Sequence, residues 1–358
     1  MDLSKYTHIN MAFGLPTAEG NFTFSGKEWL DDAVKEIQEN NSMVLMSIGG
    51  WSGSAHFSGI LKDTTARNAF INNMVSYVQQ HNLDGIDIDW EFPGRQGDTG
   101  NPIDEANDTP NFLCFLQELR SRFNSEFGAR KKLITMAVRI QPFDIDGKPT
   151  TDVAEFADYV DFANIMQYDV NGSWGETTGP NAPLEFECNR GNQQSFASAI
   201  EDWTNAGWPA DKLTAGLAFY GHAMTAVKDM TQEPSNQYQP ITKTVPQGDK
   251  EDKPEDGAPY SGSWQWKHLR DQGLLCTPTE AAEPWTRHWD NVTKTPWLFN
   301  SESKVYISYD DPQSIREKAA FAKKKGLAGV MVWSIENDYQ DELLDAALAV
   351  GKCALSTS

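Results

Sequence analysis

Residues 85–91 read GIDIDWE and carry three carboxylic acids at every second position: Asp87, Asp89 and Glu91. In a β-strand successive side chains point to opposite faces, so the three acids share one face, with neighbouring Cα atoms roughly 6.6 Å apart. Carboxylates this close raise one another's pKa, and one of them can stay protonated near neutral pH. The spacing therefore predicts general acid–base chemistry on one face of a strand.

The residues around this row alternate between strand-like and helix-like stretches. Short apolar, β-branched runs recur along the chain, and amphipathic stretches such as 66–81 and 195–207 lie between them. Such alternation indicates a parallel sheet, and at 358 residues an α/β fold of the (β/α)8 TIM-barrel type is favoured over a doubly wound sheet. The predicted strands are 7–14, 43–50, 85–91, 133–140, 162–169, 212–221 and 328–336.

In a barrel, the apolar residues between the acids face the helices and the acids point inward. Glu91 comes last, at the C-terminal end of the strand, where barrel active sites open, so it is the acid best placed to contact a ligand. Asp89 and Asp87 lie successively deeper. Two other interpretations remain: an acidic stripe on a solvated antiparallel sheet, or a divalent-metal site, which would need further ligands nearby.

Residues 222–305 interrupt the alternation. They are rich in proline, glycine and charge, yet they hold five of the chain's twelve tryptophans. A disordered segment would be poor in aromatic residues, so we expect an inserted α+β lobe, with 304–311 as its closing strand. The predicted domains are a catalytic barrel, residues 1–221 and 306–358, and a lobe, residues 222–305.

The stretch LDGIDIDWE (83–91) matches the D-x-x-D-x-D-x-E signature of the family-18 glycoside hydrolases, the chitinase family. Four other stretches resemble family elements in the same order: SIGGW (47–51), MQYD (166–169), GLAFYG (216–221) and GVMVWSIEND (329–338). The resemblance covers nearly the whole chain. It implies a TIM barrel with an α+β lobe between strands seven and eight.

The resemblance also implies a mechanism without a protein nucleophile, in which the substrate's acetamide oxygen attacks the anomeric carbon. Glu91 would be the general acid and later the base. Asp89 would orient the acetamide N–H, and Asp87 would share a proton with Asp89. Tyr168 would donate its hydroxyl to the acetamide oxygen. The predicted substrate is chitin, cleaved at β-1,4 N-acetylglucosamine linkages with retention of configuration.

Further residues are candidates for binding the sugar. Trp333 is expected to stack beneath the cleaved sugar, and Met166 to share the pocket with Tyr168. Ser47, Gly49 and Gly50 are expected mainly to pack beside the acid strand, and Trp174 is a weaker candidate for a cleft. The remaining substrate-binding candidates are Asp169, Tyr220, Phe13, Trp51 and Arg139.

The acid signature normally lies on the fourth barrel strand, but here it lies on the third predicted strand, and 7–14 resembles the second. We therefore expect the first barrel strand to be missing from this chain. An open barrel would leave the edges of strands 7–14 and 328–336 unpaired.

A net charge of −21 argues against nucleic acid and anionic membranes as partners, and no apolar run reaches the roughly 18 residues of a membrane span. The expected partners are chitin and N-acetylglucosamine oligomers, with no cofactor and no metal, and we expect a monomer. The resemblance implies an extracellular protein, although no signal peptide follows Met1. Cys114 is predicted to be a buried thiol, and Cys188 and Cys276 could pair in an exported protein.

Two alternatives to a chitinase remain at this level. One is an inactive chitin-binding lectin of the same fold, although such relatives typically lack the acid at the position of Glu91. The other is an endo-β-N-acetylglucosaminidase acting on N-glycans, a class that commonly lacks a lobe like 222–305.

Overall fold

The computed structural model describes residues 2–254, 257–348 and 351 of the chain. It divides into two compact units, Met1–Asn164 with Asp202–Leu213, and Ile165–Glu201 with Thr214–Ser358. We call these the first and second units and describe each on its own. Among the described residues, no helix has the length and apolar character needed to cross a membrane.

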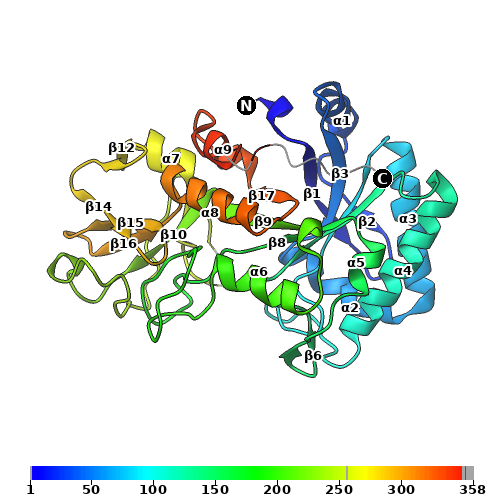
Figure 1. Ribbon diagram of the computed structural model, residues 1–358, viewed down its shortest axis with the longest axis horizontal. Helices are drawn as coiled ribbons and strands as arrows, with labels where there is room; N and C mark the ends of the chain where they lie inside the picture. The colour runs from blue at the N-terminus through cyan, green and yellow to red at the C-terminus, as the bar shows by residue number, and fades with distance from the viewer. Residues whose placement is uncertain (1, 255–256, 349–350, 352–358) are drawn as a thin grey trace. The chain divides into compact units, whose positions relative to one another are not determined.

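The first unit is built on a sheet in the order β2-β1-β3-β4-β5-β8 (Figure 1). Strands β1, β3, β4 and β5 run parallel, whereas β2 pairs antiparallel with the end of β1. The bounds are β1 His8–Pro16, β2 Phe22–Thr23, β3 Met43–Gly49, β4 Gly85–Asp89, β5 Leu133–Val138 and β8 Phe162–Ile165. A short hairpin adds β6 Asp144–Ile145 and β7 Lys148–Pro149.

Amphipathic helices cover this sheet, and α2, α3 and α4 pack against one another (Figure 1). Trp90, which follows β4, stacks on Phe57 at 5.4 Å and meets Phe112 edge-on at 5.5 Å, so aromatic rings join β4 to α2 and α4. The bounds are α1 Leu30–Glu39, α2 Phe57–Lys62, α3 Thr64–Gln80, α4 Asp108–Phe127 and α5 Phe156–Tyr159, with 3-10 turns η1 Leu3–Lys5, η2 Ser52–His56 and η3 Ala210–Lys212.

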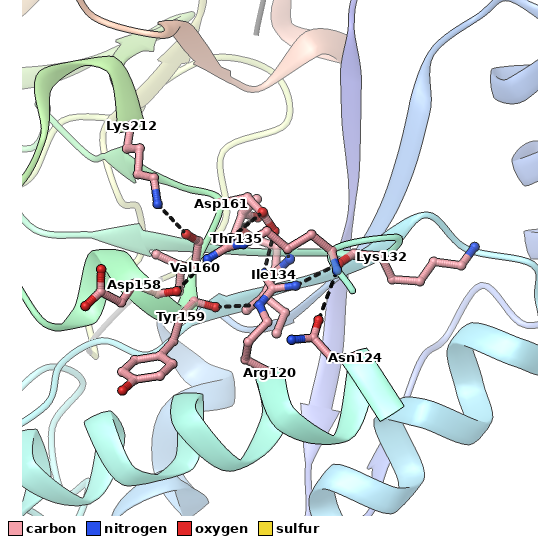
Figure 2. Close-up of polar contacts among 12 residues, drawn as sticks. Arg120, Asn124, Lys132, Ile134, Thr135, Asp158, Tyr159, Val160, Asp161 and Lys212 are labelled. Carbon is pink, nitrogen blue, oxygen red and sulfur yellow. Dashed lines mark hydrogen bonds and ion pairs between the residues drawn. The ribbon is translucent and has the colours of Figure 1, made fainter. Parts of the chain in front are cut away.

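A charged network centred on Asp161 ties the starts of β5 and β8 to α4 (Figure 2). The Asp161 carboxylate accepts hydrogen bonds from Arg120 Nη2 at 2.6 Å and from the Ile134 backbone N–H at 2.8 Å. The guanidinium of Arg120 also donates to the carbonyls of Tyr159 and Lys132, at 2.9 and 3.0 Å. One buried arginine thus donates hydrogen bonds to a carboxylate and to two backbone carbonyls at the amino ends of the strands.

The second unit contains the parallel pair β9 (Leu213–Ala218) and β17 (Gly329–Trp333) and a five-stranded antiparallel sheet in the order β11-β10-β16-β15-β14. The sheet strands are β10 Tyr220–Thr225, β11 Ser263–Gln265, β14 Trp285–Asp290, β15 Thr295–Asn300 and β16 Val305–Ser308. The other elements are α6 Phe196–Asn205, α7 Trp266–Asp271, α8 Pro312–Lys324, α9 Glu342–Ala347, β12 Leu275–Thr277, β13 Glu280–Ala281, η4 Met230–Gln232 and η5 Ile335–Asn337.

Strand β16 lies in the centre of the five-stranded sheet, between β10 and β15 (Figure 1). The approach of β10 to β16 is so close that a Cβ atom on Gly221 would lie 1.7 Å from the carbonyl oxygen of Ser308, which only glycine permits. The sequence predicted a strand at 304–311, and β16 is found there as the last strand of this sheet in chain order. Its pairing with β10 and β15 places it in the centre of the sheet.

All seven predicted barrel strands are present, as β1, β3, β4, β5, β8, β9 and β17, and they alternate with helices as expected for a TIM-barrel-like α/β fold. The predicted helices at 66–81 and 195–207 correspond to α3 and α6. The predicted absence of the first barrel strand stays a prediction, as does the division into barrel and lobe.

The described cysteines are all free thiols. Cys188 and Cys276 are exposed and unpaired, so the pairing considered from the sequence is not found. Cys114 is only partly buried, not fully as predicted, because its position on α4 places it next to Glu118, 3.6 Å away, at the edge of the helix interface.

Candidate functional site

The acid row lies at the carboxyl end of β4, in the first unit. Asp87 and Asp89 are buried, with exposed fractions of 2% and 6%, and Glu91, just past the strand, is half-buried. The apolar residues between them, Ile86 and Ile88, are fully buried against the helical layer. The alternation predicted from GIDIDWE is therefore the alternation observed.

Asp87 is held by neutral hydrogen-bond donors from the neighbouring strands. Ser47 Oγ on β3 donates to Oδ2 at 2.7 Å, and Thr135 Oγ1 on β5 donates to Oδ1 at 2.6 Å. Asn164 Nδ2 on β8 also donates to this oxygen, at 3.4 Å. Burial raises the pKa of Asp87, and these donors act in the opposite direction by stabilising the ionised form.

Asp89 has a very different environment. Among the described residues no hydrogen-bond donor reaches its Oδ1, although this oxygen is buried. The pKa of Asp89 is raised well above its ordinary value, first by burial and then by the negative charges of Glu91 and Asp87. Asp89 is therefore suited to carry a proton, and its orphaned oxygen is suited to accept a hydrogen bond from a ligand.

Glu91 is positioned by the turn that follows β3. Its backbone N–H donates to Ser54 Oγ at 2.8 Å, and Ser54 Oγ in turn donates to the carbonyl oxygen of Gly50 at 2.8 Å. Gly49 has a φ of 119°, and a Cβ there would lie 2.0 Å from the carbonyl oxygen of Asp89. Gly49 therefore lets β3 approach the end of the acid strand, as predicted, whereas Gly50 lies against the ring of Phe13.

Two aromatic candidates lie beside the acid row in the first unit. Phe13 is half-buried against Gly50, where an added Cβ would lie 2.9 Å from its ring. Trp51 is 44% exposed and meets the ring of Phe92, the residue after Glu91, edge-on at 6.3 Å. The role of both rings in binding a sugar stays a prediction.

Two charged residues in the first unit have structural contacts. Asp84, the first acid of the signature, accepts hydrogen bonds from the Val44 backbone at 2.9 Å and from Gln38 at 3.0 Å, so it holds the start of the strand. Arg139 is mostly buried and donates to Asp144 at 2.7 Å and to Gln141. These contacts fix Arg139 in its own network, and its role in binding substrate stays a prediction.

Tyr168 is the centre of a small cluster in the second unit. It is 8% exposed and packs with Ala182 and Ala218, and with the partly buried Met166, Tyr220 and Met331. The rings of Tyr168 and Tyr220 meet edge-on with centroids 5.9 Å apart. The cluster brings together three residues that the sequence placed in one pocket: Tyr168, Met166 and Tyr220.

Asp169, which follows Tyr168, is held by two donors on one carboxylate oxygen. Tyr220 Oη donates to Oδ1 at 2.7 Å, and His222 Nε2 lies 2.7 Å from the same atom. Asn181 accepts from the Asp169 backbone N–H at 2.9 Å, which supports its left-handed backbone, with a φ of 57°. Oδ2 points to no donor among the described residues, so it is open to a sugar hydroxyl.

Two tryptophans of the second unit have exposed rings. Trp333 ends β17 opposite Ala218 and is 38% exposed. Trp174 is 59% exposed, yet its ring lies on Gly172 and meets His222 edge-on at 4.9 Å. An exposed ring held in place is suited to stacking on the apolar face of a sugar.

Several polar residues of the site were missed from the sequence. Ser47 was expected mainly to pack, but it also donates a hydrogen bond to Asp87; Thr135 and Asn164 were not considered. His222 could have been found, because it is two residues after Tyr220 on β10 and so shares its face. Among the described residues, no group of three or more His, Cys, Asp or Glu side chains is arranged to hold a metal ion.

Comparison with known proteins shows which family the chain resembles. The family model for glycosyl hydrolases family 18 matches residues 1–338. A "chitinase-like effector" of Moniliophthora perniciosa is 37% identical, over 96% of this chain and 81% of that protein. Chitinase A1 of Niallia circulans is 29% identical over 92% of this chain, which spans only 46% of that longer protein.

Solved structures agree with the sequence relatives. A crystal structure of a chitinase from Rhizomucor miehei has a TM-score of 0.90 and 32% identity, covering 98% of this chain and 95% of that one. A Group IV chitinase of Ostrinia furnacalis, in complex with allosamidin, has a TM-score of 0.80 and 27% identity, covering 98% and 93%. The chain therefore belongs to glycosyl hydrolases family 18.

Proposed function

We propose that this protein is a secreted chitinase that hydrolyses β-1,4 linkages between N-acetylglucosamine units with retention of configuration. The observation that carries the proposal is the complete acid row. A hydrogen-bonded Asp87, a buried Asp89 with an orphaned Oδ1 and a half-buried Glu91 follow one another toward the end of β4. The relatives named as chitinases support the choice of substrate.

The proposed reaction has two steps. In the first, Glu91 donates its proton to the leaving oxygen while the substrate's acetamide oxygen attacks the anomeric carbon, which forms a cyclic oxazolinium ion. Asp89 accepts the acetamide N–H and stabilises the positive charge that develops. In the second step, Glu91 removes a proton from a water molecule whose oxygen attacks the anomeric carbon. The bond between that carbon and the acetamide oxygen breaks, which opens the oxazolinium ring and restores the original configuration.

The second unit supplies the proposed sugar contacts. Tyr168 donates its hydroxyl to the acetamide oxygen, and Met166 packs beside it. Trp333 stacks on the sugar, and Asp169, held by Tyr220, accepts a sugar hydroxyl through its open oxygen. We further propose that residues 1–221 and 306–358 carry the chemistry and that 222–305 form an inserted lobe.

The test compares the wild type with Glu91→Gln on colloidal chitin. We expect the wild type to release soluble N-acetylglucosamine oligomers and Glu91→Gln to lose about a hundredfold or more of that rate, because the amide can neither donate nor accept the catalytic proton. Glu28→Gln, at an exposed position, is the matched control and should retain full activity. Product analysis by chromatography gives the rates.

The same assay separates the alternatives. Release from chitin that is unchanged in Glu91→Gln would contradict the proposed mechanism. Binding of chitin without release by the wild type would identify a sugar-binding protein, in keeping with relatives named "chitinase-like effector". Release from an N-glycoprotein but not from chitin would identify an endo-N-acetylglucosaminidase.

A further inference from the structure

Five asparagines of the chain begin the sequence Asn-x-Ser/Thr, and the proposed reaction uses none of them. In secreted proteins this sequon is the acceptor for N-linked oligosaccharides, which are attached to the side-chain nitrogen Nδ2. An oligosaccharide is bulky and hydrated, so a folded protein can carry it only where Nδ2 reaches solvent. The contacts of the five side chains therefore indicate which sequons can be used: Asn21, Asn40, Asn107, Asn171 and Asn291.

Asn171 lies in the second unit, and its amide is packed against the backbone of residues 179 and 180. Nδ2 donates a hydrogen bond to the carbonyl oxygen of Pro180 at 2.9 Å. A Cβ atom on Gly179 would lie 2.7 Å from Cγ of Asn171, so the two segments are in close contact. A sugar on this nitrogen would have to displace Pro180, which is itself buried. The fold therefore leaves no room for a glycan at Asn171.

The three sequons of the first unit have side chains that are engaged in hydrogen bonds. Asn40 is half-buried after α1, and its Nδ2 donates to the carbonyl oxygen of Glu36 at 2.9 Å. Asn107 is exposed, but its Nδ2 donates to Asp104 Oδ1 at 2.9 Å. Asn21 is exposed too, and its Oδ1 accepts a hydrogen bond of 2.6 Å from a side chain on α3. None of the three combines an exposed position with a side chain that makes no hydrogen bond.

Asn291 lies at the tip of the hairpin formed by β14 and β15 in the second unit. Asp290 Oδ1 accepts hydrogen bonds from the backbone N–H groups of Val292 at 2.9 Å and Thr293 at 2.7 Å, which fixes the turn around Asn291. Asn291 and Val292 are exposed. In the part of the chain that the structure describes, no residue makes a hydrogen bond with the side chain of Asn291. Its nitrogen can therefore carry a large group without breaking a contact.

We propose that Asn291 is an N-glycosylation site and that Asn171, the other sequon of the second unit, is not modified. The inference rests on the secretion included in the proposed function, and it does not depend on the acid row. In the modification, Nδ2 forms a bond to the anomeric carbon of the first sugar of a lipid-linked oligosaccharide. The bond between that carbon and the diphosphate of the lipid breaks, the diphosphate leaves with the bonding electrons, and one proton passes from Nδ2 to solvent.

The hydroxyl of the sequon indicates when the sugar is attached. Thr293 is fully buried, and its Oγ1 lies 3.0 Å from Asp290 Oδ1 and 2.8 Å from Thr295 Oγ1. Its carbonyl oxygen also accepts a hydrogen bond of 2.7 Å from the backbone N–H of Leu184. An enzyme that reads the sequon cannot reach this threonine in the folded hairpin. The modification therefore precedes the pairing of β14 with β15, and the folded turn only has to accommodate the sugar.

The first test maps the sugars on the unsubstituted chain. The full chain is produced behind a secretion leader in a eukaryotic host cell, and the secreted and the retained protein are both collected. Enzymatic release of N-glycans converts each modified asparagine to aspartate, so mass spectrometry of the peptides gives the modified fraction at each sequon. We expect Asn291 to be modified in most molecules and Asn171 in almost none.

The second test uses two substitutions at exposed positions. Asn291→Gln removes the acceptor and should lower the mass of the intact protein by one glycan. Asn205→Gln, at the end of α6 and outside any sequon, is the matched control and should leave the glycan mass unchanged. Both variants should release oligomers from colloidal chitin at the rate of the wild type.

An unmodified Asn291, in cells whose own glycoproteins are modified, would overturn the proposal, and so would a glycan on Asn171. Release from colloidal chitin by the same preparation is measured separately. A protein that carries the glycan on Asn291 but is inactive would support this inference and overturn the proposed activity. An active protein without sugar on Asn291 would do the reverse.

Discussion

Asp89 is a costly residue for the folded protein. Its carboxyl is buried, it lies beside two other acids, and its Oδ1 has no hydrogen-bond donor among the described residues. A buried polar atom without a partner costs stability, and natural proteins retain such groups mainly where function requires them. The orphaned oxygen therefore supports a functional role for Asp89 on grounds independent of any motif.

This cost leads to a prediction about stability and pH. Because the pKa of Asp89 is raised on folding, the protonated form fits the folded state, and the wild type loses stability as the pH rises through that value. We expect Asp89→Asn to be more stable than the wild type at pH 8, with the advantage shrinking toward pH 4, while hydrolysis of chitin is lost. Thermal unfolding across this range measures the difference.

The control for this prediction is Asp32→Asn, an exposed aspartate in the first turn of α1. It removes one negative charge from the surface without touching the acid row. Its effect on thermal unfolding should be small at all pH values. Equal stability of Asp89→Asn and the wild type at every pH would contradict the prediction that ionisation of Asp89 lowers the stability of the folded protein.

Strand β4 is the element that the sequence described best. The period of two in GIDIDWE separates acids from apolar residues, and the structure shows the same separation, with Ile86 and Ile88 fully buried. The partners of the row could not be derived in this way, because they depend on register between strands. Thr135 and Ser47 lie opposite Asp87 only through the pairing of β5 and β3 with β4, which no local pattern specifies.

At the amino ends of the strands, we expect the Asp161 network to be a main contributor to stability (Figure 2). Arg120→Met should lower the free energy of unfolding by about 3 kcal/mol, because it removes the buried cation paired with the mostly buried Asp161 carboxylate and the donor to two carbonyls. Arg122→Met, two residues away on α4, removes only an exposed pair with Glu126 and should cost less than about 0.5 kcal/mol.

Denaturant titration of the two arginine variants measures this difference. Because the network lies at the opposite end of the strands from Glu91, the activity of each folded molecule should be unchanged. Similar losses for Arg120→Met and Arg122→Met would show that the buried network contributes no more than a surface ion pair.

The net charge of the protein affects which form of chitin, the proposed substrate, it is expected to bind more tightly. With a net charge of −21, the surface is expected to attract chitin whose sugars are partly deacetylated and so carry ammonium groups. We expect Glu91→Gln to bind partly deacetylated chitin more tightly than fully acetylated chitin at low salt. The preference should fade toward 1 M salt, where the screening length falls to about 3 Å.

Sedimentation binding assays with both polymers over a range of salt concentrations test this expectation. Fully acetylated chitin is neutral and serves as the reference, since its binding should change little with salt. The same salt dependence for both polymers would show that the net charge plays no part in substrate choice.

At the scale of the whole chain, the sequence predicted seven strands, the helices between them and an aromatic-rich lobe, because periodicity and composition are local properties. It did not predict that the strand at Val305–Ser308 occupies the middle of the five-stranded sheet, because that position is set by pairing with β10 far upstream. Local patterns identify elements, whereas their order in a sheet depends on contacts between distant residues.

The central position of β16 also has a consequence during synthesis of the chain. Thr225 on β10 pairs with Val305 on β16, so β10 leaves the ribosome long before this neighbour in the sheet exists. Until then, the edge of β10 that will face β16 has no partner strand, and pairing across so many residues is slow. The interval before residue 305 emerges is therefore a period in which this strand is open to wrong pairing, and binding of chaperones to the nascent chain is expected then.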